Sequence, residues 1–274
     1  AILQQAWADI KPREEIGVKI GKFKTPFSHA YLTTLGETLF PQMPTSLTAQ
    51  VILPYSLNAV TPHIGMGFDL GVEVHGLINN KFGYEAGIFN GNGAGNNTAN
   101  KTWSDDWHIP SLLYAGRLTY QPHGPMPATQ GDPHNLTSDK MLIGVSGSIN
   151  VESEYESTND LRVGAEWSWI KNRWYFGAEC YWMHVGFTKR QKIDKSYNYL
   201  GGYAQAGYFI TPKLQGAIRY DFFERNSTGK GGFLNMPAAG LNYYFDDINL
   251  KLQGMYQYTG RTGHKRQLDR DEDN

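Results

Sequence analysis

Apolar and polar residues alternate with a period of two along most of this chain, a pattern that predicts β-strands with one apolar and one polar face. In one early segment, for example, Val18 and Ile20 oppose Lys19. About twelve strands are predicted, at 3–11, 17–24, 70–78, 82–91, 112–121, 141–151, 161–169, 174–182, 199–209, 214–222, 238–245 and 248–258. Many are near ten residues long, which is the length that a tilted strand needs to cross a membrane.

The connections between these strands alternate between tight and long. The tight ones are 12–16, 79–81, 171–173, 211–213 and 246–247, and the long polar ones are 28–68, 92–111, 152–160, 188–196 and 224–232. Tight turns at one rim and long loops at the other are typical of outer-membrane β-barrels. One connection, 121–139, lies on the tight side yet is long and rich in Pro and Gly. We predict that it protrudes into the periplasm.

The longest connection, 28–68, shows no regular period. A segment of this length without secondary structure is uncommon in a compact domain unless it is functional. We predict that it folds back into the bore of the barrel and narrows it, as a constriction loop. The pattern of residues does not distinguish a constriction from a plug that closes the bore.

The order of the connections also bears on the two ends of the chain. The first predicted strand runs from the outside inward, and the last one leads to the long-loop side. Bacterial barrels have an even number of strands and normally begin and end at the periplasmic rim. We therefore expect residues 1–274 to form a single outer-membrane barrel domain that lacks an odd number of strands at each end.

Aromatic residues are abundant, with 17 Tyr, 13 Phe and 7 Trp. Aromatic rings suit the two membrane interfaces, where one end of the ring is dry and the other is wet. Those that gather near the ends of predicted strands are Trp167, Trp169, Trp174, Trp182, Tyr243, Phe245, Tyr256 and Tyr258. We interpret them as two aromatic girdles; the alternative is the core of a soluble sandwich or barrel.

Charge and composition exclude several classes of protein. The net charge of −1 leaves no basic footprint for nucleic acid. The mean hydropathy is −0.48, and no apolar run reaches the roughly 18 residues of a membrane helix. Cys180 is the only cysteine, so the chain has no internal disulfide and no cysteine cluster for a metal. The sequence predicts no cofactor.

Charged residues recur on the polar face of the predicted strands. In a barrel they line the bore, where rings of charge set the ion preference; in a soluble barrel they face water or pair with one another. The predicted pore-lining residues are Lys19, Lys22, Lys24, Arg117, Arg162, Arg219, Lys251, Glu73, His75, Glu166 and Glu179, with Glu85 and Asp221 on the same face. Because the signs nearly cancel, they predict weak selectivity.

Lys22 and Lys24 stand apart from the other predicted pore-lining residues. They fall out of phase with Lys19, which indicates a bulge near Gly21. Both lie at the base of the long loop. Of the predicted pore cations, these two lysines are the first candidates for facing the solute.

Several motifs together resemble the phosphate-selective porin O and P family. They are GKFKTPFS (21–28) before the long loop, LGVEVHG (70–76) after it, then FGYEAGIFNG, YAGRLTY, GYAQAGYFIT and GLNYYF. The resemblance covers most of the chain. It implies a sixteen-stranded, trimeric porin of the bacterial outer membrane, with three strands before residue 1 and one after residue 274.

The chain departs from the family pattern where selectivity is decided. Phosphate-selective members line their constriction with Arg and Lys, whereas no Lys or Arg occurs here between Thr25 and Asn80. The resemblance therefore implies passage of small anions, with phosphate as one candidate, or of other small hydrophilic solutes.

The sequence thus predicts a passive channel rather than an enzyme. Its expected partners are outer-membrane lipid and lipopolysaccharide, small inorganic anions or hydrophilic solutes, and two further copies of the chain in a homotrimer. Two alternatives remain: a plugged, structural or partner-sheathing barrel, and a barrel-borne hydrolase. A hydrolase needs a nucleophile beside a base, and Ser146 and Ser148 face inward with no histidine assigned next to them.

Overall fold

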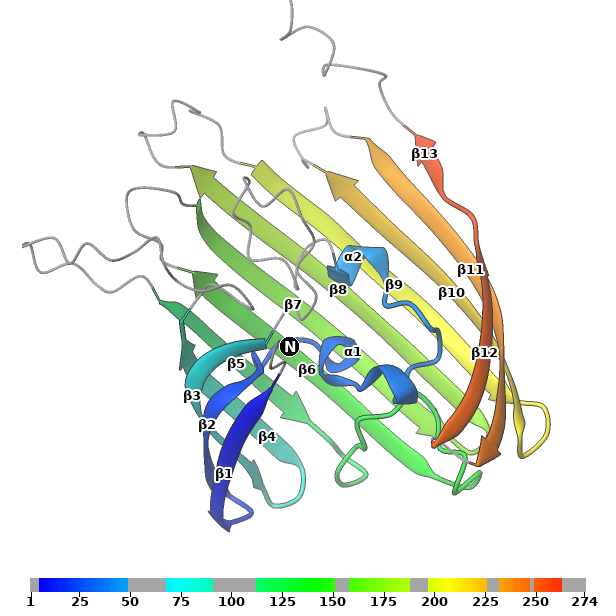
Figure 1. Cartoon of the computed structure of the whole chain (residues 1–274), viewed down its shortest axis with the longest axis horizontal. Coiled ribbons are helices and arrows are strands. Elements are labelled where there is room, and N and C mark those ends of the chain that lie inside the picture. Colours follow the sequence, from blue (N-terminus) through cyan, green and yellow to red (C-terminus); the bar gives the residue numbers. More distant parts are fainter. Residues whose placement is uncertain are drawn as a thin grey trace, which may run out of the picture.

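The computed structural model describes residues 5–48, 68–90, 112–150, 158–187, 197–225, 232–246 and 249–262. In these segments thirteen strands form one antiparallel sheet, in which the first twelve follow one another in sequence order and the last strand pairs with the eleventh. Figure 1 shows this sheet curving around the short helices that follow the second strand. No helix of the described segments is long and apolar enough to cross a membrane. The prediction of an all-β, antiparallel fold is confirmed.

Every predicted strand is found, and a short thirteenth follows the last. The strands are β1 (Ala6–Arg13), β2 (Ile16–Lys24), β3 (Phe68–Ile78), β4 (Phe82–Phe89), β5 (Leu113–Tyr120), β6 (Asp139–Asn150), β7 (Thr158–Lys171), β8 (Trp174–Phe187), β9 (Tyr197–Phe209), β10 (Leu214–Arg225), β11 (Phe233–Asp246), β12 (Leu250–Gln257) and β13 (Gly260–Thr262). β13 pairs with β11 beyond the end of β12. The predicted ends at 3–4, 91, 151 and 248 lie outside the described residues.

The two faces of the sheet have opposite character, as the alternation predicts. On β10, Ile218 points outward with 65 % of its surface exposed, whereas Asp221 on the inner face is 0 % exposed. The same alternation of exposed apolar and buried polar residues recurs from β5 to β11. An apolar outer face suits contact with lipid, because lipid offers no partner for polar groups.

Two tight turns owe their form to asparagine. Asn79 and Asn80, between β3 and β4, both have φ of 54°, and the Lys81 amide donates to the Ile78 carbonyl at 3.0 Å. This is a type I′ turn, whose twist matches that of the flanking strands. Asn172, between β7 and β8, also has a positive φ, of 53°. Asparagine tolerates this conformation better than most residues.

Aromatic rings form a ladder on the outer face near the rim of the tight turns. Trp174 of β8 stacks on Phe176 with 5.4 Å between ring centroids and lies 4.5 Å from Tyr208 of β9. Phe176 also contacts Trp167 and Trp169 of β7. Such a cluster at one end of the outer face is the arrangement expected of an aromatic girdle.

The described part of the long loop, up to residue 48, lies on the concave inner face of the sheet (Figure 1). It contains α1 (His29–Leu32), the 3₁₀ segment η1 (Leu35–Glu37) and α2 (Thr45–Leu47). α2 contacts β9 and β10. The loop is therefore folded inward as predicted, and residues 49–67 lie outside the described part of the chain.

The connection between β5 and β6 also reaches the inner face. Gln130 is buried, its amide donates to the Glu37 carbonyl at 3.0 Å, and its side-chain oxygen accepts from the Leu39 amide at 2.8 Å. Gln205 of β9 donates to the same oxygen at 2.9 Å. The middle of this connection therefore supports the inward-folded loop, and its protrusion into the periplasm stays a prediction.

The outer face makes a first testable prediction. Replacing Ile218 by Arg puts a charge at the middle of the apolar face of β10 and should lower the free energy of unfolding by about 2–4 kcal/mol. The urea dependence of folding into lipid vesicles measures this loss. Ala128→Arg, in the exposed part of the 121–138 connection, is the control and should change little. Equal losses in the two variants would contradict a lipid-facing role for this surface.

Candidate functional site

The inward-folded loop that follows β2 is held by its backbone amides. Ser28 caps α1, and its Oγ accepts from the Tyr31 amide at 3.1 Å. The amides of the two residues between Ser28 and Tyr31 donate to carboxylates of the wall. His29 N donates to Glu166 Oε2 at 2.5 Å, and Ala30 N donates to Glu179 Oε1 at 2.7 Å. The first amides of a helix have no partner within the helix, so these two glutamates supply the acceptors that they lack.

The two glutamates lie directly opposite each other on neighbouring strands. Glu166 of β7 and Glu179 of β8 are register partners. Glu179 is bound further by two tyrosine hydroxyls, from Tyr181 to Oε2 at 2.7 Å and from Tyr203 to Oε1 at 2.8 Å. Like charges this close repel each other, and the donors that surround them offset that repulsion. The pair forms the dock for α1.

A third carboxylate docks the second helix of the loop. Asp221 of β10 accepts from the Thr45 amide at 2.5 Å and from the Ser46 amide at 3.3 Å. Its register partner on β9 is Tyr203, which in turn lies opposite Glu179 on β8. The three carboxylates thus stand in one row across the inner face of the sheet, and the row positions α1 and α2.

Basic residues of the wall bind carbonyl oxygens of the loop. Lys24 Nζ donates to the carbonyls of Tyr31 at 2.6 Å and Thr33 at 3.1 Å. Lys251 of β12 donates to the Thr38 carbonyl at 2.9 Å. These oxygens lie at or after the C-terminal end of α1, where backbone carbonyls lack intrahelical partners and attract cations.

Arg219 of β10 anchors the loop further along the chain. Its NH1 donates to the Gln42 carbonyl at 2.8 Å, and its guanidinium lies 4.6 Å from the centre of the Phe40 ring. An amide of β11 acts beside it, since Asn242 Nδ2 donates to the Leu39 carbonyl at 2.8 Å. Three predicted pore cations, Lys24, Arg219 and Lys251, are therefore engaged by the loop itself.

Two apolar clusters complete the contact between loop and wall. The first joins Phe27, Ala30, Tyr31 and Leu47 of the loop to Tyr181 and Tyr203. The second joins Leu39 and Phe40 to Ile170, Tyr175, Ala217 and Ala238. Burying one such large side chain contributes roughly 1.5–3 kcal/mol. The loop is thus packed against β7–β11 over much of its described length.

A glycine on β6 lets Glu166 reach a second partner. Gly144 is the register neighbour of Glu166, and a Cβ at Gly144 would stand 2.3 Å from Glu166 Oε1. Without that Cβ the carboxylate lies across β6, where Oε1 accepts from Arg117 Nε of β5 at 2.8 Å. Glu166 therefore connects Arg117 to the amide of His29.

The inner face from β1 to β5 carries a separate series of ion pairs. Lys19 Nζ lies 3.0 Å from Glu73 Oε1, and His75 Nε2 lies 2.9 Å from Asp9 Oδ1. Arg117 NH1 lies 3.0 Å from Glu85 Oε2. The last pair borders a cavity of about 240 Å³ near the rim of the tight turns, lined also by Lys11, His75, Thr119, Gln121 and Met126.

Two further residues predicted to line the pore, Lys22 and Arg162, differ from each other in their surroundings. Lys22 lies opposite Leu70 of β3, whose side chain is exposed on the outer face, so Lys22 takes the outward phase and its place in the pore stays a prediction. Gly21, beside it, has a φ of 134°. Arg162 is buried on the inner face, with Nε 3.3 Å from Met183 Sδ.

Sequence reasoning missed several side chains that hold the loop. Gln130, Gln205, Asn242 and Gln253 are polar, inward-facing and bonded to the loop or to each other. For the three on strands, Gln205, Asn242 and Gln253, the inward phase in the alternation was the available signal. Gln130 lies in the connection between β5 and β6, where no alternation marks it. Within the described ranges no three His, Cys, Asp or Glu side chains converge as metal ligands.

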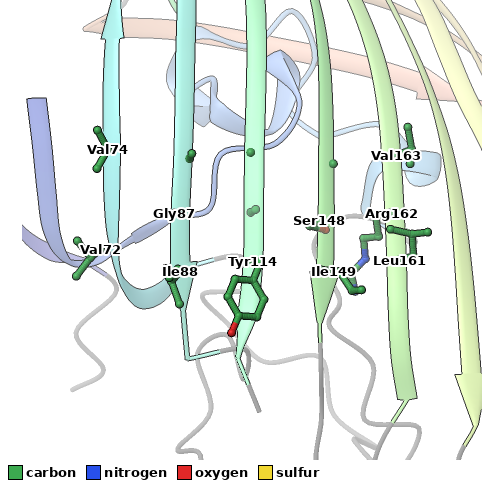
Figure 2. A pocket seen from close by; sticks show the side chains of 14 residues that line it. Val72, Val74, Gly87, Ile88, Tyr114, Ser148, Ile149, Leu161, Arg162 and Val163 are labelled. Carbon is green, nitrogen blue, oxygen red and sulfur yellow. The ribbon is translucent and has the colours of Figure 1, made fainter. Parts of the chain in front are cut away.

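A larger depression of about 670 Å³ lies on the opposite, outer face. Small outward residues on adjacent strands, Ala86, Gly116 and Gly147, form part of its lining. Figure 2 shows Ile88 and Tyr114 beside it, on neighbouring strands. Because it lies outside the wall, away from the loop, this depression is not part of the constriction.

Comparison with known proteins agrees with this architecture. The family model described as phosphate-selective porin O and P matches residues 1–274. The chain belongs to this family. The expected family resemblance is thereby confirmed, and the curved sheet with its inward loop is the wall of a porin. Membership favours a channel of the bacterial outer membrane over an enzyme.

Two individual proteins are also similar to this chain. An uncharacterized protein of Caulobacter vibrioides is 28 % identical over 123 residues, which is 45 % of this porin and 23 % of that relative. The porin therefore matches less than a quarter of the relative's length. A BenF-like porin from Pseudomonas fluorescens Pf-5 aligns over 90 % of this chain and 70 % of its own, with a TM-score of 0.39 and 11 % identity.

Substitution of Gly144 tests whether the missing Cβ is what allows Glu166 to bond both Arg117 and the His29 amide. Gly144→Val should push the Glu166 carboxylate off its site and break its bonds to Arg117 and His29 N, with a loss of about 1–3 kcal/mol for buried groups left without partners. Hydrogen exchange at the His29 amide should become faster, and the free energy of unfolding should fall.

Gly147→Val is the matched control on the same strand. Gly147 faces outward, and a Cβ there meets only the Arg162 carbonyl, at an ordinary 3.6 Å. This variant should leave exchange at His29 unchanged. If both variants exchange alike, Gly144 has no special role in seating Glu166.

The buried side chain of His29 should make the stability of the folded protein depend on pH. Burial, aided by the positive charge of Arg117, lowers the pKa of His29 to about 3. The unfolded chain binds a proton near pH 6.5 whereas the folded chain resists it, so stability should be highest above pH 6.5 and fall as the pH drops towards 3, by at most about 1.4 kcal/mol per pH unit. Urea unfolding at several pH values measures this slope.

In the His29→Gln variant, the contribution of this histidine to the pH dependence of stability should be lost, because glutamine does not titrate. His123→Gln, at an exposed histidine of the tight-turn rim, should keep it. A wild-type slope that survives in His29→Gln would show that other groups cause it.

Proposed function

We propose that this porin forms a passive channel through which small hydrophilic solutes diffuse across the outer membrane. The observation that carries the proposal is the loop docked inside a wall that is polar within and apolar outside. A bore narrowed by a loop of its own chain excludes solutes by size, and the charges that line it bias which ions pass. No bond is made or broken in this process.

The position of the loop indicates where the open path lies. Residues 25–48 pack on β7–β11 through their amides, carbonyls and apolar side chains. The inner face of β1–β5 instead carries ion pairs and the 240 Å³ cavity. We assign the path to this second surface, with Lys19, Glu73, His75, Glu85 and Arg117 along it.

Small anions, phosphate among them, are the solutes that the family's description suggests. The lysines and arginines of the inner face support that class by their number, but those that contact the loop are bound to its carbonyls. A general pathway for small hydrophilic solutes needs no unpaired cation. Small hydrophilic solutes in general are therefore the class of solute that the arrangement supports best.

The partners of the channel follow from its outer surface. Exposed Ile, Leu and Val side chains on the outer face favour contact with the acyl chains of outer-membrane lipid and lipopolysaccharide. A homotrimer, as the family resemblance implies, would cover part of this face, and the apolar depression on β3–β7 suits either contact.

A plugged barrel is the second candidate function. The loop and the 121–138 connection meet at Gln130, an arrangement that would also suit closure of the bore. Constriction and closure differ in conductance, so one measurement separates them.

Reconstitution of the purified full-length protein in a planar lipid bilayer tests the proposal. Stepwise, voltage-independent increases in current should accompany each insertion, because a water-filled path conducts without gating chemistry. Folded and inserted protein, verified by protease protection in the same lipid, that passes no current would overturn the porin function and favour the plugged barrel.

A further inference from the structure

One arginine and two glutamates on the proposed path form a bonded group in which negative charges outnumber positive ones. Arg117 on β5 bonds Glu85 of β4 through NH1, at 3.0 Å. It bonds Glu166 of β7 through Nε and NH2, at 2.8 and 2.7 Å. One guanidinium is thus shared by two carboxylates. The set carries one positive and two negative formal charges, so its net charge is negative.

The three members of the set differ in their contact with water. The Glu85 side chain is 27 % exposed, whereas Arg117 is 9 % and Glu166 is 1 % exposed. Glu85 and Arg117 both line the 240 Å³ cavity. Only Oε2 of Glu85 is bonded to Arg117, and no donor among the described residues reaches Oε1. Both side chains therefore reach the cavity, and the carboxylate is the more exposed of the two.

The neighbouring pairs along the path do not restore a positive surface. Lys19 is bound to Glu73 at 3.0 Å, and its ammonium lies over the rings of Trp7 and Phe23, at 5.7 and 5.0 Å from their centres. In two further pairs the acid is the more exposed partner: His75 with Asp9, and Lys11 of the cavity lining with Glu14, 2.6 Å away. Each of these cations is satisfied locally, which weakens its attraction for a passing anion.

We propose that Glu85, with Asp9 as a second contributor, sets the charge preference of the path, so that it passes small cations and ammonium-bearing solutes more readily than inorganic anions. This inference rests on the proposed function, because selectivity has meaning only for an open path. It gives Arg117 the role of a positioning residue, which holds the Glu85 carboxylate at the wall of the cavity.

The physical basis is the field of a fixed carboxylate in a confined path. Charges on walls of low dielectric focus their potential into the water between them and raise the local concentration of ions of opposite sign. The effect weakens as the ionic strength increases, because salt shortens the range of the field. Preference for cations should therefore be strongest in dilute electrolyte.

Reversal potentials under a KCl gradient test the inference, with the full-length porin in the same bilayer. The wild type should show a permeability ratio of K⁺ to Cl⁻ above one. Glu85→Gln removes the charge but keeps an oxygen for Arg117, and should lower the ratio roughly twofold, as expected for the loss of one partly screened charge. Asp9→Asn should lower it by a smaller factor.

Asp139→Asn is the matched control. Asp139 lies near the same rim but in an exposed position, where it accepts from Trp169 Nε1, and its neutral variant should keep the wild-type ratio. A wild type that conducts with a preference for Cl⁻, or a Glu85→Gln variant whose ratio equals that of Asp139→Asn, would overturn the inference and leave the porin function intact. Absence of current from inserted protein would instead refute the proposed function.

Discussion

The interior of this porin depends on the bonds between three wall carboxylates and the backbone amides of the loop. Buried amides without acceptors are costly, and helices as short as α1 and α2 leave most of their amides without intrahelical partners. Glu166, Glu179 and Asp221 meet this need from one row across β7–β10. The apolar clusters add to the stability of the contact, but the carboxylates fix where each helix begins.

A consequence is that charge inside the bore serves two separate purposes. On β7–β12 acids bind loop amides, and Lys251 and Arg219 bind loop carbonyls. On β1–β5 acids and bases bind one another and border a cavity. Glu166 belongs to both regions, since it joins His29 of the loop to Arg117 of β5. A count of charged residues on the inner face therefore includes several whose bonds go to the loop.

The sequence predicted the wall far better than the contacts inside it. Strands followed from alternation, which depends only on near neighbours, and the inward phase of Glu166 and Asp221 followed from it as well. The partners of these side chains did not, because the His29–Glu166 bond joins residues 137 apart and the Asn242–Leu39 bond joins residues 203 apart. Lys24 shows the limit: its place at the base of the loop was predicted, whereas its bonds to loop carbonyls depend on the path of the folded loop.

These sequence separations impose an order on assembly. The amides of α1 and α2 find their acceptors on β7, β8 and β10, at sequence separations of 137, 149 and 176 residues. Contacts between distant residues form slowly, since a long stretch of chain must first be closed. The row of acceptors spans β7–β10 and exists only where these strands are paired, so the loop can dock only onto wall that has already formed. An early segment of the chain thus takes its final position from a later one.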